Sequence, residues 1–192
     1  MAQDPPHNDD DTPHELAEAA GRQPPVLTLP RARFDERVTR ALAAAQQYGE
    51  SIALLLVDLD YFSKFNARYG QPAGDAALVS IHRRIVASVG TKDMAARLAD
   101  DSFAVLCRTN VGRYGSMMAY RLCSRISNGA VEIQGADDAY FFTASIGVAL
   151  FPGSGASTPV DFMTLAEEAL RRAKAAGRNR VVVANEPPYD DD

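Results

Sequence analysis

Two acidic stretches of the sequence have residue types and spacings that suit chemistry on phosphates. The apolar run LLLVDLD ends in Asp58 and Asp60, which project from the same face of a strand because side chains alternate along it. The turn-like stretch RLADDSF places Asp100 and Asp101 side by side before another apolar run. A carboxylate at a strand end suits Mg²⁺, which binds a few hard oxygens and leaves its other positions to water or phosphate. Aspartate also closes strands and caps turns, so a structural interpretation of these acids stays open.

Four further residues have side chains that could bind a nucleotide. Lys174 and Arg178 are four positions apart, which predicts two cations on one helix face, able to embrace a triphosphate. The alternative is a solvated basic helix end that the helix macrodipole favours. A carboxylate such as Asp75 can accept from the N1–H and amine of guanine, and an amide such as Asn66 can pair with the remaining edge. Taken alone, each of these two is an ordinary loop or cap residue.

The elements that must position these residues alternate between helical and strand patterns. Apolar spacing predicts helices over 34–47, 74–89, 112–127 and 160–176, and strands over 51–60, 95–98, 103–107, 141–151 and 180–185. The two strands on either side of RLADDSF predict a β-hairpin with the adjacent acids at its tip. Interleaved helices and strands with one hairpin predict an α/β (α+β) domain, in which helices cover a mixed central sheet. A binding site is expected where loops leave the strand ends.

The length and composition are those of one globular domain with tails. The chain has 192 residues, of which 46% are hydrophobic and 23% charged. Residues 1–30 hold six of the eleven prolines and predict a flexible tail, although Thr12 to Gly21 has the pattern of a capped short helix. Residues 186–192 predict an acidic C-terminal tail. The domain is therefore expected over residues 31–185.

Several classes of protein are disfavoured by the sequence. No stretch approaches the roughly 18 to 20 apolar residues of a membrane-spanning helix, and the N-terminus lacks a secretory signal, so we expect a cytoplasmic protein without membrane contact. A net charge of −5 argues against broad nucleic-acid binding. Cys107 and Cys123 have no metal-ligand spacing and predict buried reduced thiols.

Three segments resemble the GGDEF (diguanylate cyclase) domain family. Residues 58–78, DLDYFSKFNARYGQPAGDAAL, follow its pattern D-x-D-x-F-K-x-x-N-D-x-x-G-H-x-x-G-D-x-x-L with the spacing kept. Residues 143–149, TASIGVA, resemble its next strand, and residues 166–180, AEEALRRAKAAGRNR, resemble its closing helix and turn. The resemblance covers about residues 27–184. It implies the fold of nucleotidyl-cyclase catalytic cores, with GTP and Mg²⁺ bound above a hairpin whose tip reads G-G-D/E-E-F.

The resemblance also implies roles for six residues of this chain. Asp58 and Asp101 match the metal-ligating acids, Asn66 and Asp75 the guanine-recognising pair, and Lys174 and Arg178 the phosphate-contacting cations. In the family's reaction a 3′-hydroxyl attacks the α-phosphorus of a second GTP, so a metal is needed to neutralise charge that spreads over the phosphates.

The hairpin tip departs from the family pattern, because it reads Ala99-Asp100-Asp101-Ser102-Phe103. Ala99 and Asp100 replace two glycines, the residue type that allows φ > 0 in a tight turn and a close approach of backbone to pyrophosphate. Asp100 also adds negative charge, and two unit charges about 4 Å apart repel by roughly 4 kcal/mol at an effective dielectric near 20. A bound Mg²⁺ would reverse that effect by enlisting the extra acid. Ser102 replaces the family's catalytic glutamate.

Other departures are spread along the chain. Ser63 stands where the family has lysine, and the opening segment VLTLPRARF is two residues shorter than the family's. The product-inhibition motif R-x-x-D keeps Asp93 but has Gly90 in place of arginine, so a bidentate guanidinium contact is missing. We therefore expect no product inhibition through this site.

Together these patterns predict a degenerate GGDEF-domain protein of cyclic-di-GMP signalling. It is expected to be catalytically inactive and to act by binding a nucleotide or a protein, with Mg²⁺ as cofactor only if nucleotide is bound. The expected partners are GTP or cyclic-di-GMP, an EAL or HD-GYP phosphodiesterase or another signalling protein, and a second copy of the chain. One alternative is a weakly active diguanylate cyclase that converts two GTP to cyclic-di-GMP; another is an interaction module without nucleotide affinity.

Overall fold

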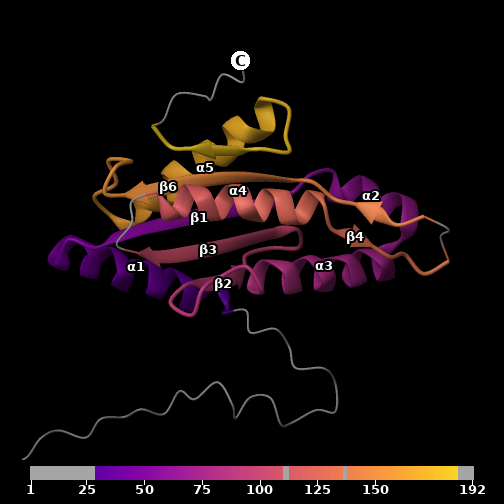
Figure 1. Ribbon diagram of the computed structural model, residues 1–192, viewed down its shortest axis with the longest axis horizontal. Coiled ribbons are helices and arrows are strands. Elements are labelled where there is room, and N and C mark those ends of the chain that lie inside the picture. The colour runs from indigo at the N-terminus through magenta and orange to yellow at the C-terminus, as the bar shows by residue number, and fades with distance from the viewer. Residues whose placement is uncertain (1–28, 110–112, 136–137, 186–192) are drawn as a thin grey trace, which may run out of the picture.

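A five-stranded mixed sheet forms the centre of the computed structural model (Figure 1), which describes residues 29–109, 113–135 and 138–185. The expectations for residues 1–28, with the short helix at Thr12, and for residues 186–192 lie outside these ranges. The sheet order is β2-β3-β1-β6-β7, with β1 Ser51–Leu59, β2 Met94–Arg97, β3 Ser102–Thr109, β6 Ala144–Phe151 and β7 Val181–Val183. Only the pairing of β6 with β7 is parallel among these strands.

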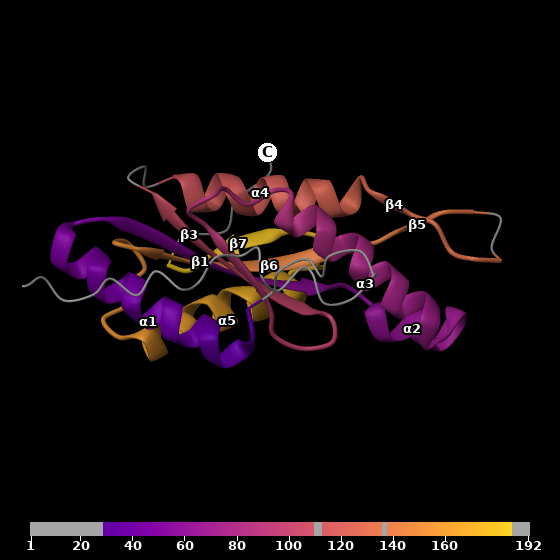
Figure 2. The same ribbon diagram turned by 90° about the horizontal axis from the view of Figure 1, so that it is seen from below.

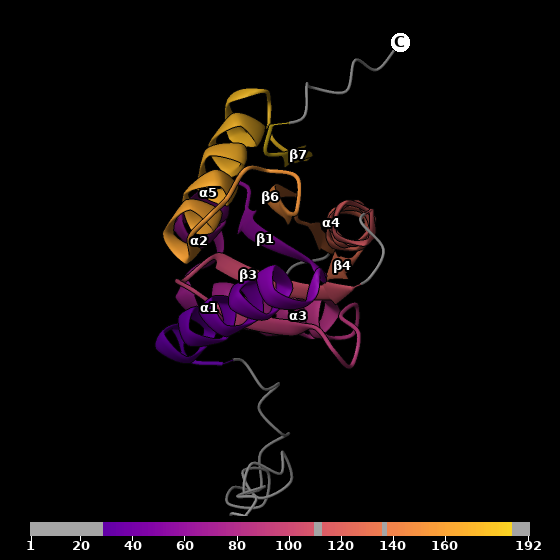
Figure 3. The same ribbon diagram turned by 90° about the vertical axis from the view of Figure 1, so that its left-hand side faces the viewer.

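Helices cover both faces of this sheet, so the predicted α/β class and mixed sheet are confirmed. The helices are α1 Arg31–Tyr48, α2 Phe62–Tyr69, α3 Gln71–Val86, α4 Tyr114–Ser127 and α5 Pro159–Ala175. Helices α1 and α5 pack on one face, and α4 lies on the other (Figure 3). Buried residues of α2 and α3 join those of α4 in the core on that second face.

Strand β1 is buried on both faces, as its nearly continuous apolar run predicted. Ala53, Leu55 and Val57 face the core beneath α3 and α4, whereas Leu54 and Leu56 face α1 and α5. The strand ends where its sequence changes from apolar to acidic. Its aspartates therefore lie at the end of the sheet where β1 finishes, which is called the site edge below.

The strand register brings the hairpin tip to the site edge. Strands β2 and β3 pair antiparallel as the predicted hairpin, with Arg97 opposite Phe103. In the neighbouring pairings Asp58 lies opposite Ser102 of β3 and opposite Ser145 of β6. The acidic end of β1 is therefore flanked by a hydroxyl side chain on each neighbouring strand.

The single strand predicted over 141–151 is wrong. Residues Tyr140–Phe141 form β5, which pairs with β4 (Ala130–Val131) in a separate two-stranded sheet at the end where α2 lies (Figure 2). Between β5 and β6, Phe142 is buried against Phe65, with ring centroids 4.7 Å apart, and Thr143 bonds to Asp60. Phe142 and Thr143 thus lie between β5 and β6 and belong to neither strand. Strand β4 and helix α2 have no counterpart among the elements predicted from the sequence.

Gly147 explains how closely α5 approaches the sheet. A Cβ at this position of β6 would collide with the backbone of α5 at Ala166 and Leu170, the Cα of Leu170 lying only 2.8 Å away. Glycine therefore allows α5 to lie directly on β6, with Lys174 near the end of the helix reaching the site edge, which holds Asp58. None of the helices in the described part of the chain has the length and hydropathy to span a bilayer.

Candidate functional site

A cleft of about 210 Å³ lies at the site edge, where β1 ends and α2 begins. It is lined by Asp58, Leu59, Asp60, Tyr61, Phe62, Ser63, Asp101, Lys174 and Arg178. Four of the six residues that the family resemblance marks for function are thus brought together: Asp58, Asp101, Lys174 and Arg178. The other two, Asn66 and Asp75, lie further along α2 and α3.

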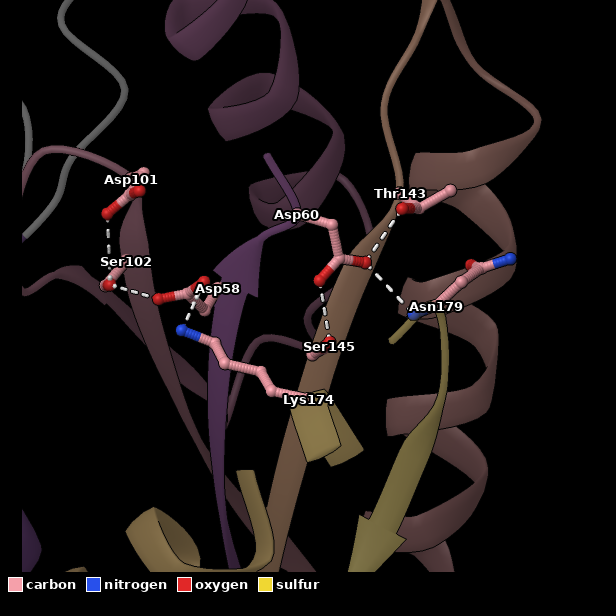
Figure 4. A network of polar contacts seen from close by, with 8 residues as sticks. All are labelled: Asp58, Asp60, Asp101, Ser102, Thr143, Ser145, Lys174 and Asn179. Carbon is pink, nitrogen blue, oxygen red and sulfur yellow. Dashed lines mark hydrogen bonds and ion pairs between the residues drawn. The ribbon is translucent and has the colours of Figure 1, made fainter. Parts of the chain in front are cut away.

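Both carboxylate oxygens of Asp58 have partners within the chain (Figure 4). The Lys174 ammonium lies 2.7 Å from Oδ1. The Ser102 hydroxyl donates to Oδ2 at 3.0 Å. Because the Asp58 side chain is only 15% exposed, water and salt weaken the attraction in this ion pair less than they do in a surface pair. Ser102, at the position of the family's glutamate, thus stabilises the Asp58 charge instead of repelling it.

Asp101 lies on the other side of Ser102. Its Oδ1 is 3.5 Å from the Ser102 hydroxyl, and its backbone carbonyl accepts from the Leu59 N–H at 3.1 Å. Burial and then the negative charge of Asp58 raise the pKa of the Asp101 carboxyl above its ordinary value. The two acids therefore share a confined region in which a divalent cation would relieve their repulsion.

Asp60 is buried and has a different set of partners. Its carboxylate accepts from the hydroxyls of Thr143 and Ser145, each at 2.7 Å, and from the Asn179 N–H at 3.0 Å (Figure 4). Asp58 is paired with α5, and Asp60, one residue beyond the end of β1, bonds to the turn after α5. Asp60 thereby joins the end of β1 to β6 and to the turn that carries Arg178.

The expectation that Lys174 and Arg178 lie on one helix face is wrong. Helix α5 ends at Ala175, and Arg178 follows in a turn where its φ is 66°. Gly177, with φ of 111°, ends the helical path, and the Arg178 N–H donates to Ala173 O at 3.0 Å. Both cations still line the cleft, because the turn folds Arg178 back over it.

The hairpin tip closes without the backbone freedom of glycine. In the described part of the chain, the residues with a side chain and positive φ are Tyr61, Arg178, Asn179 and Asn185, so Ala99 and Asp100 keep ordinary backbone angles. The Arg97 guanidinium donates to the carbonyls of Ala99 at 3.2 Å and Asp100 at 2.7 Å. Phe103 is buried and stacks on His82 of α3, with ring centroids 5.9 Å apart. The tip is therefore an ordered turn, with Asp100 exposed.

Asn66 lies on α2 and Asp75 on α3, on either side of the corner between these helices. The Asn66 Oδ1 is buried and has no hydrogen-bond partner among the described residues. Gly74 leaves the space it occupies, since a Cβ on Gly74 would collide with that oxygen. Asp75 is exposed on the next position of α3. A buried acceptor without a partner costs about 1–3 kcal/mol.

Gly90 and Asp93 lie in a different place, at a pocket of about 640 Å³ that Lys92, Arg108 and Tyr114 also line. The Asp93 carboxylate accepts from the Gly90 N–H at 2.9 Å, the Arg108 N–H at 3.1 Å and the Tyr114 hydroxyl at 2.9 Å. Burial and this hydrogen bond raise the pKa of Tyr114. The Asp93 carboxylate is thus fixed by three hydrogen bonds from its own chain.

The acids near the cleft suit one magnesium ion that arrives with phosphates. Across residues 29–109, 113–135 and 138–185, no group of three or more His, Cys, Asp and Glu is arranged to hold a metal. Asp58 and Asp101 offer two carboxylates, which is a common protein contribution to Mg²⁺ when a nucleotide supplies further oxygens.

Comparison with known proteins agrees with this arrangement. The family model described as diguanylate cyclase, GGDEF domain, matches residues 29–180. The bifunctional diguanylate cyclase/cyclic di-GMP phosphodiesterase MucR of Pseudomonas aeruginosa is 35% identical over 149 residues, which are 78% of this chain and 21% of MucR. The diguanylate cyclase TpbB of the same species is 35% identical over 167 residues, 84% of this chain and 38% of TpbB. The chain therefore spans well under half the length of these curated relatives.

Solved structures show the same fold. The crystal structure of the TpbB (YfiN) GGDEF domain has a TM-score of 0.78 at 31% identity, covering 84% of this chain and 99% of that one. The GGDEF domain of DgcB from Caulobacter crescentus, solved in complex with c-di-GMP, has a TM-score of 0.76 at 25% identity, covering 83% and 92% of the two chains.

We predict that Asp60→Asn lowers the free energy of unfolding by about 2–4 kcal/mol. The amide has only one acceptor oxygen and turns N–H groups toward a site that three donors face, so buried hydrogen bonds are lost. Urea unfolding measures the change. Asp100→Asn, at an exposed carboxylate, is the control and should change stability by less than about 0.5 kcal/mol. Equal small changes in both variants would contradict a structural role for Asp60.

We also predict that Asp101→Asn stabilises the protein at neutral pH. Because the folded state raises the pKa of Asp101, its ionised form costs stability above that pKa and the cost disappears as the carboxyl is protonated. The gain should be about 0.5 kcal/mol at pH 7 to 8 and should vanish as the pH falls toward about 4. Thermal melts from pH 4 to 8 measure it, with exposed Asp138→Asn as control. A gain that is independent of pH would exclude this cause.

Proposed function

This chain belongs to the GGDEF family of diguanylate cyclase domains, and from that premise we propose that it binds a guanine nucleotide without turning it over. Its role is then regulatory, within cyclic-di-GMP signalling. The observation that carries the proposal is the pairing of both Asp58 oxygens, with Lys174 on one side and Ser102 on the other.

The changed hairpin tip argues against efficient catalysis. When bound, Mg²⁺ would neutralise charge on the phosphates, and Asp58 and Asp101 are the residues that would hold it. Lys174 competes for Asp58, and Ser102 supplies a neutral hydroxyl where the family has a third acid. Asp100 adds a negative charge next to the region that a triphosphate would enter. Each of these features weakens the hold on a metal and polyphosphate in the geometry that the reaction needs.

Two regions of the domain support retained binding of a nucleotide, one suited to its base and one to its phosphates. The unpartnered Asn66 oxygen and the exposed Asp75 carboxylate lie at one corner and suit the donors of a guanine edge. Lys174 and Arg178 line the cleft, and α2 begins there at Phe62 without a side-chain cap. Uncapped N–H groups at a helix start favour an anion. A nucleotide laid from this corner to the cleft would satisfy both regions.

We propose that the output of binding passes to a protein partner. Cyclisation of two GTP molecules requires two loaded domains to face each other, so a second copy of the chain is one candidate partner. An EAL or HD-GYP phosphodiesterase is the other, and MucR, whose name joins the cyclase and phosphodiesterase activities, supports that choice by analogy.

We predict that GTP raises the melting temperature more than ATP does. A ligand at 100 times its dissociation constant stabilises the folded state by about 2.7 kcal/mol, a shift of roughly 5–10 °C for a chain of this size. Asp75→Asn should reduce the affinity for GTP by about tenfold to a hundredfold and leave ATP unchanged, because a charged acceptor of guanine is lost. If GTP, GDP and cyclic-di-GMP all leave the melting temperature unchanged, the chain is an interaction module without nucleotide affinity.

Weak cyclase activity is the second candidate, and the adjacent acids Asp100 and Asp101 favour it. We predict no cyclic-di-GMP from wild-type protein in a chromatographic assay with GTP and either Mg²⁺ or Mn²⁺. The triple variant Ala99→Gly, Asp100→Gly, Ser102→Glu should form product, because it removes the Asp100 charge, restores both glycines and restores the third acid. Product from the wild type that disappears in Asp101→Asn would establish the weak cyclase instead.

A further inference from the structure

Tyr61 occupies an unusual backbone position at the mouth of the cleft. It is the residue between β1 and α2, with φ of 59° and ψ of 23°, a left-handed conformation that bulky side chains rarely adopt. Its carbonyl accepts from the Lys64 and Phe65 N–H groups at 3.0 and 3.1 Å, so the first turn of α2 holds it in place. Unfavourable backbone angles that the surroundings maintain tend to occur at functional sites.

The Tyr61 side chain gathers two cations. Its ring is half exposed and lines the cleft, with the Arg178 guanidinium 4.7 Å and the Lys64 ammonium 4.8 Å from the ring centroid. Arg178 also donates to the Tyr61 hydroxyl at 3.4 Å. Arg178 lies 117 positions away in the sequence and also has a left-handed backbone. Two residues with uncommon backbone angles thus meet through one aromatic ring.

A cation of α2, Lys64, lies next to Ser63 in sequence and over the Tyr61 ring. Ser63 lines the cleft but carries no charge, whereas Lys64 is one position further along α2. Lys64 is exposed, and its ammonium lies over the ring of Tyr61, a residue that lines the cleft. The same ring restricts Arg178, so less side-chain freedom is lost when Arg178 binds an anion.

We infer that Tyr61 is a positioning residue for the polyphosphate end of the ligand, holding Arg178 and Lys64 as a pair of cations at the cleft. The inference rests on the proposed nucleotide binding and adds its specificity. Terminal phosphates should be recognised through cations that one aromatic ring orients, and nucleoside triphosphates should therefore be preferred to monophosphates.

The test measures inorganic tripolyphosphate binding by titration calorimetry at low salt, with guanosine as a second probe. Tyr61→Leu should weaken tripolyphosphate binding by about fivefold to thirtyfold, because cation–π contacts to two cations are lost, and should leave guanosine binding unchanged. Tyr61→Phe keeps the ring and should stay within about threefold of the wild type. The control Tyr48→Leu, at an exposed tyrosine of α1, should change neither probe.

Lys64→Gln tests the same inference without altering the left-handed position. It should weaken tripolyphosphate binding by about threefold, and should do so only when Tyr61 is present, so that Lys64→Gln adds little in the Tyr61→Leu background. A merely structural role for Tyr61 would lower guanosine binding equally and would show no such coupling.

The outcomes separate this inference from the proposed function. Wild-type protein that binds GTP with Tyr61→Leu unchanged overturns the inference and leaves the proposed function standing. Tripolyphosphate binding that depends on Tyr61, without any guanosine or GTP binding, supports the inference and overturns guanine recognition. Wild-type protein that binds neither probe overturns both.

Discussion

The buried carboxylate of Asp60 is the interaction on which the site depends. It accepts three hydrogen bonds, from Thr143 and Ser145 near the start of β6 and from Asn179 after α5. A buried carboxylate is stable only when its lone pairs are satisfied, so these segments must meet at the end of β1. Asp58, Tyr61 and Arg178 are near neighbours of the bonded residues in sequence. Their common cleft follows from this junction.

Within the cleft, Asp58 has partners from its own chain and Asp101 has fewer. Asp58 is paired with Lys174 and bonded to Ser102, while burial and then the charge of Asp58 raise the pKa of Asp101. A metal would have to displace the Lys174 ammonium, and a phosphate would then have to attract it. In the function that we propose, ligand binding would be coupled to exchange of this ion pair, since Lys174 can serve only one anion well at a time.

The domain as a whole matches the family, and the hairpin tip is where we predict a departure from the family pattern. The match to the family model extends over residues 29–180, and the fold superposes on the TpbB domain with a TM-score of 0.78. At the tip, Arg97 bonds the carbonyls of Ala99 and Asp100, so the turn is ordered although both glycines are absent. The departure from the family pattern that we predict at this tip is therefore one of charge, because Ala99 and Asp100 have no positive φ.

The sequence by itself determined the class of fold and singled out four of the residues that line the cleft. The apolar run before Asp58 predicted a central strand, and the strands on either side of Asp100 predicted a β-hairpin; the structure has both. The motif spacing pointed to Asp58, Asp101, Lys174 and Arg178, which line one cleft. Local patterns carry this information because strand and helix periodicity and turn chemistry act over a few residues. The roles assigned to those residues stay predictions.

Only the tertiary structure decided which partner each polar group has. It showed Asp58 paired with Lys174, Asp60 bonded within the core, and Arg178 on a turn over Tyr61 instead of on a helix face. It also divided residues 141–151 between two sheets. These contacts join residues far apart in the chain, up to 119 positions for Asp60 and Asn179. A single sequence contains no signal for such pairs, because their distance depends on how all the strands and helices pack.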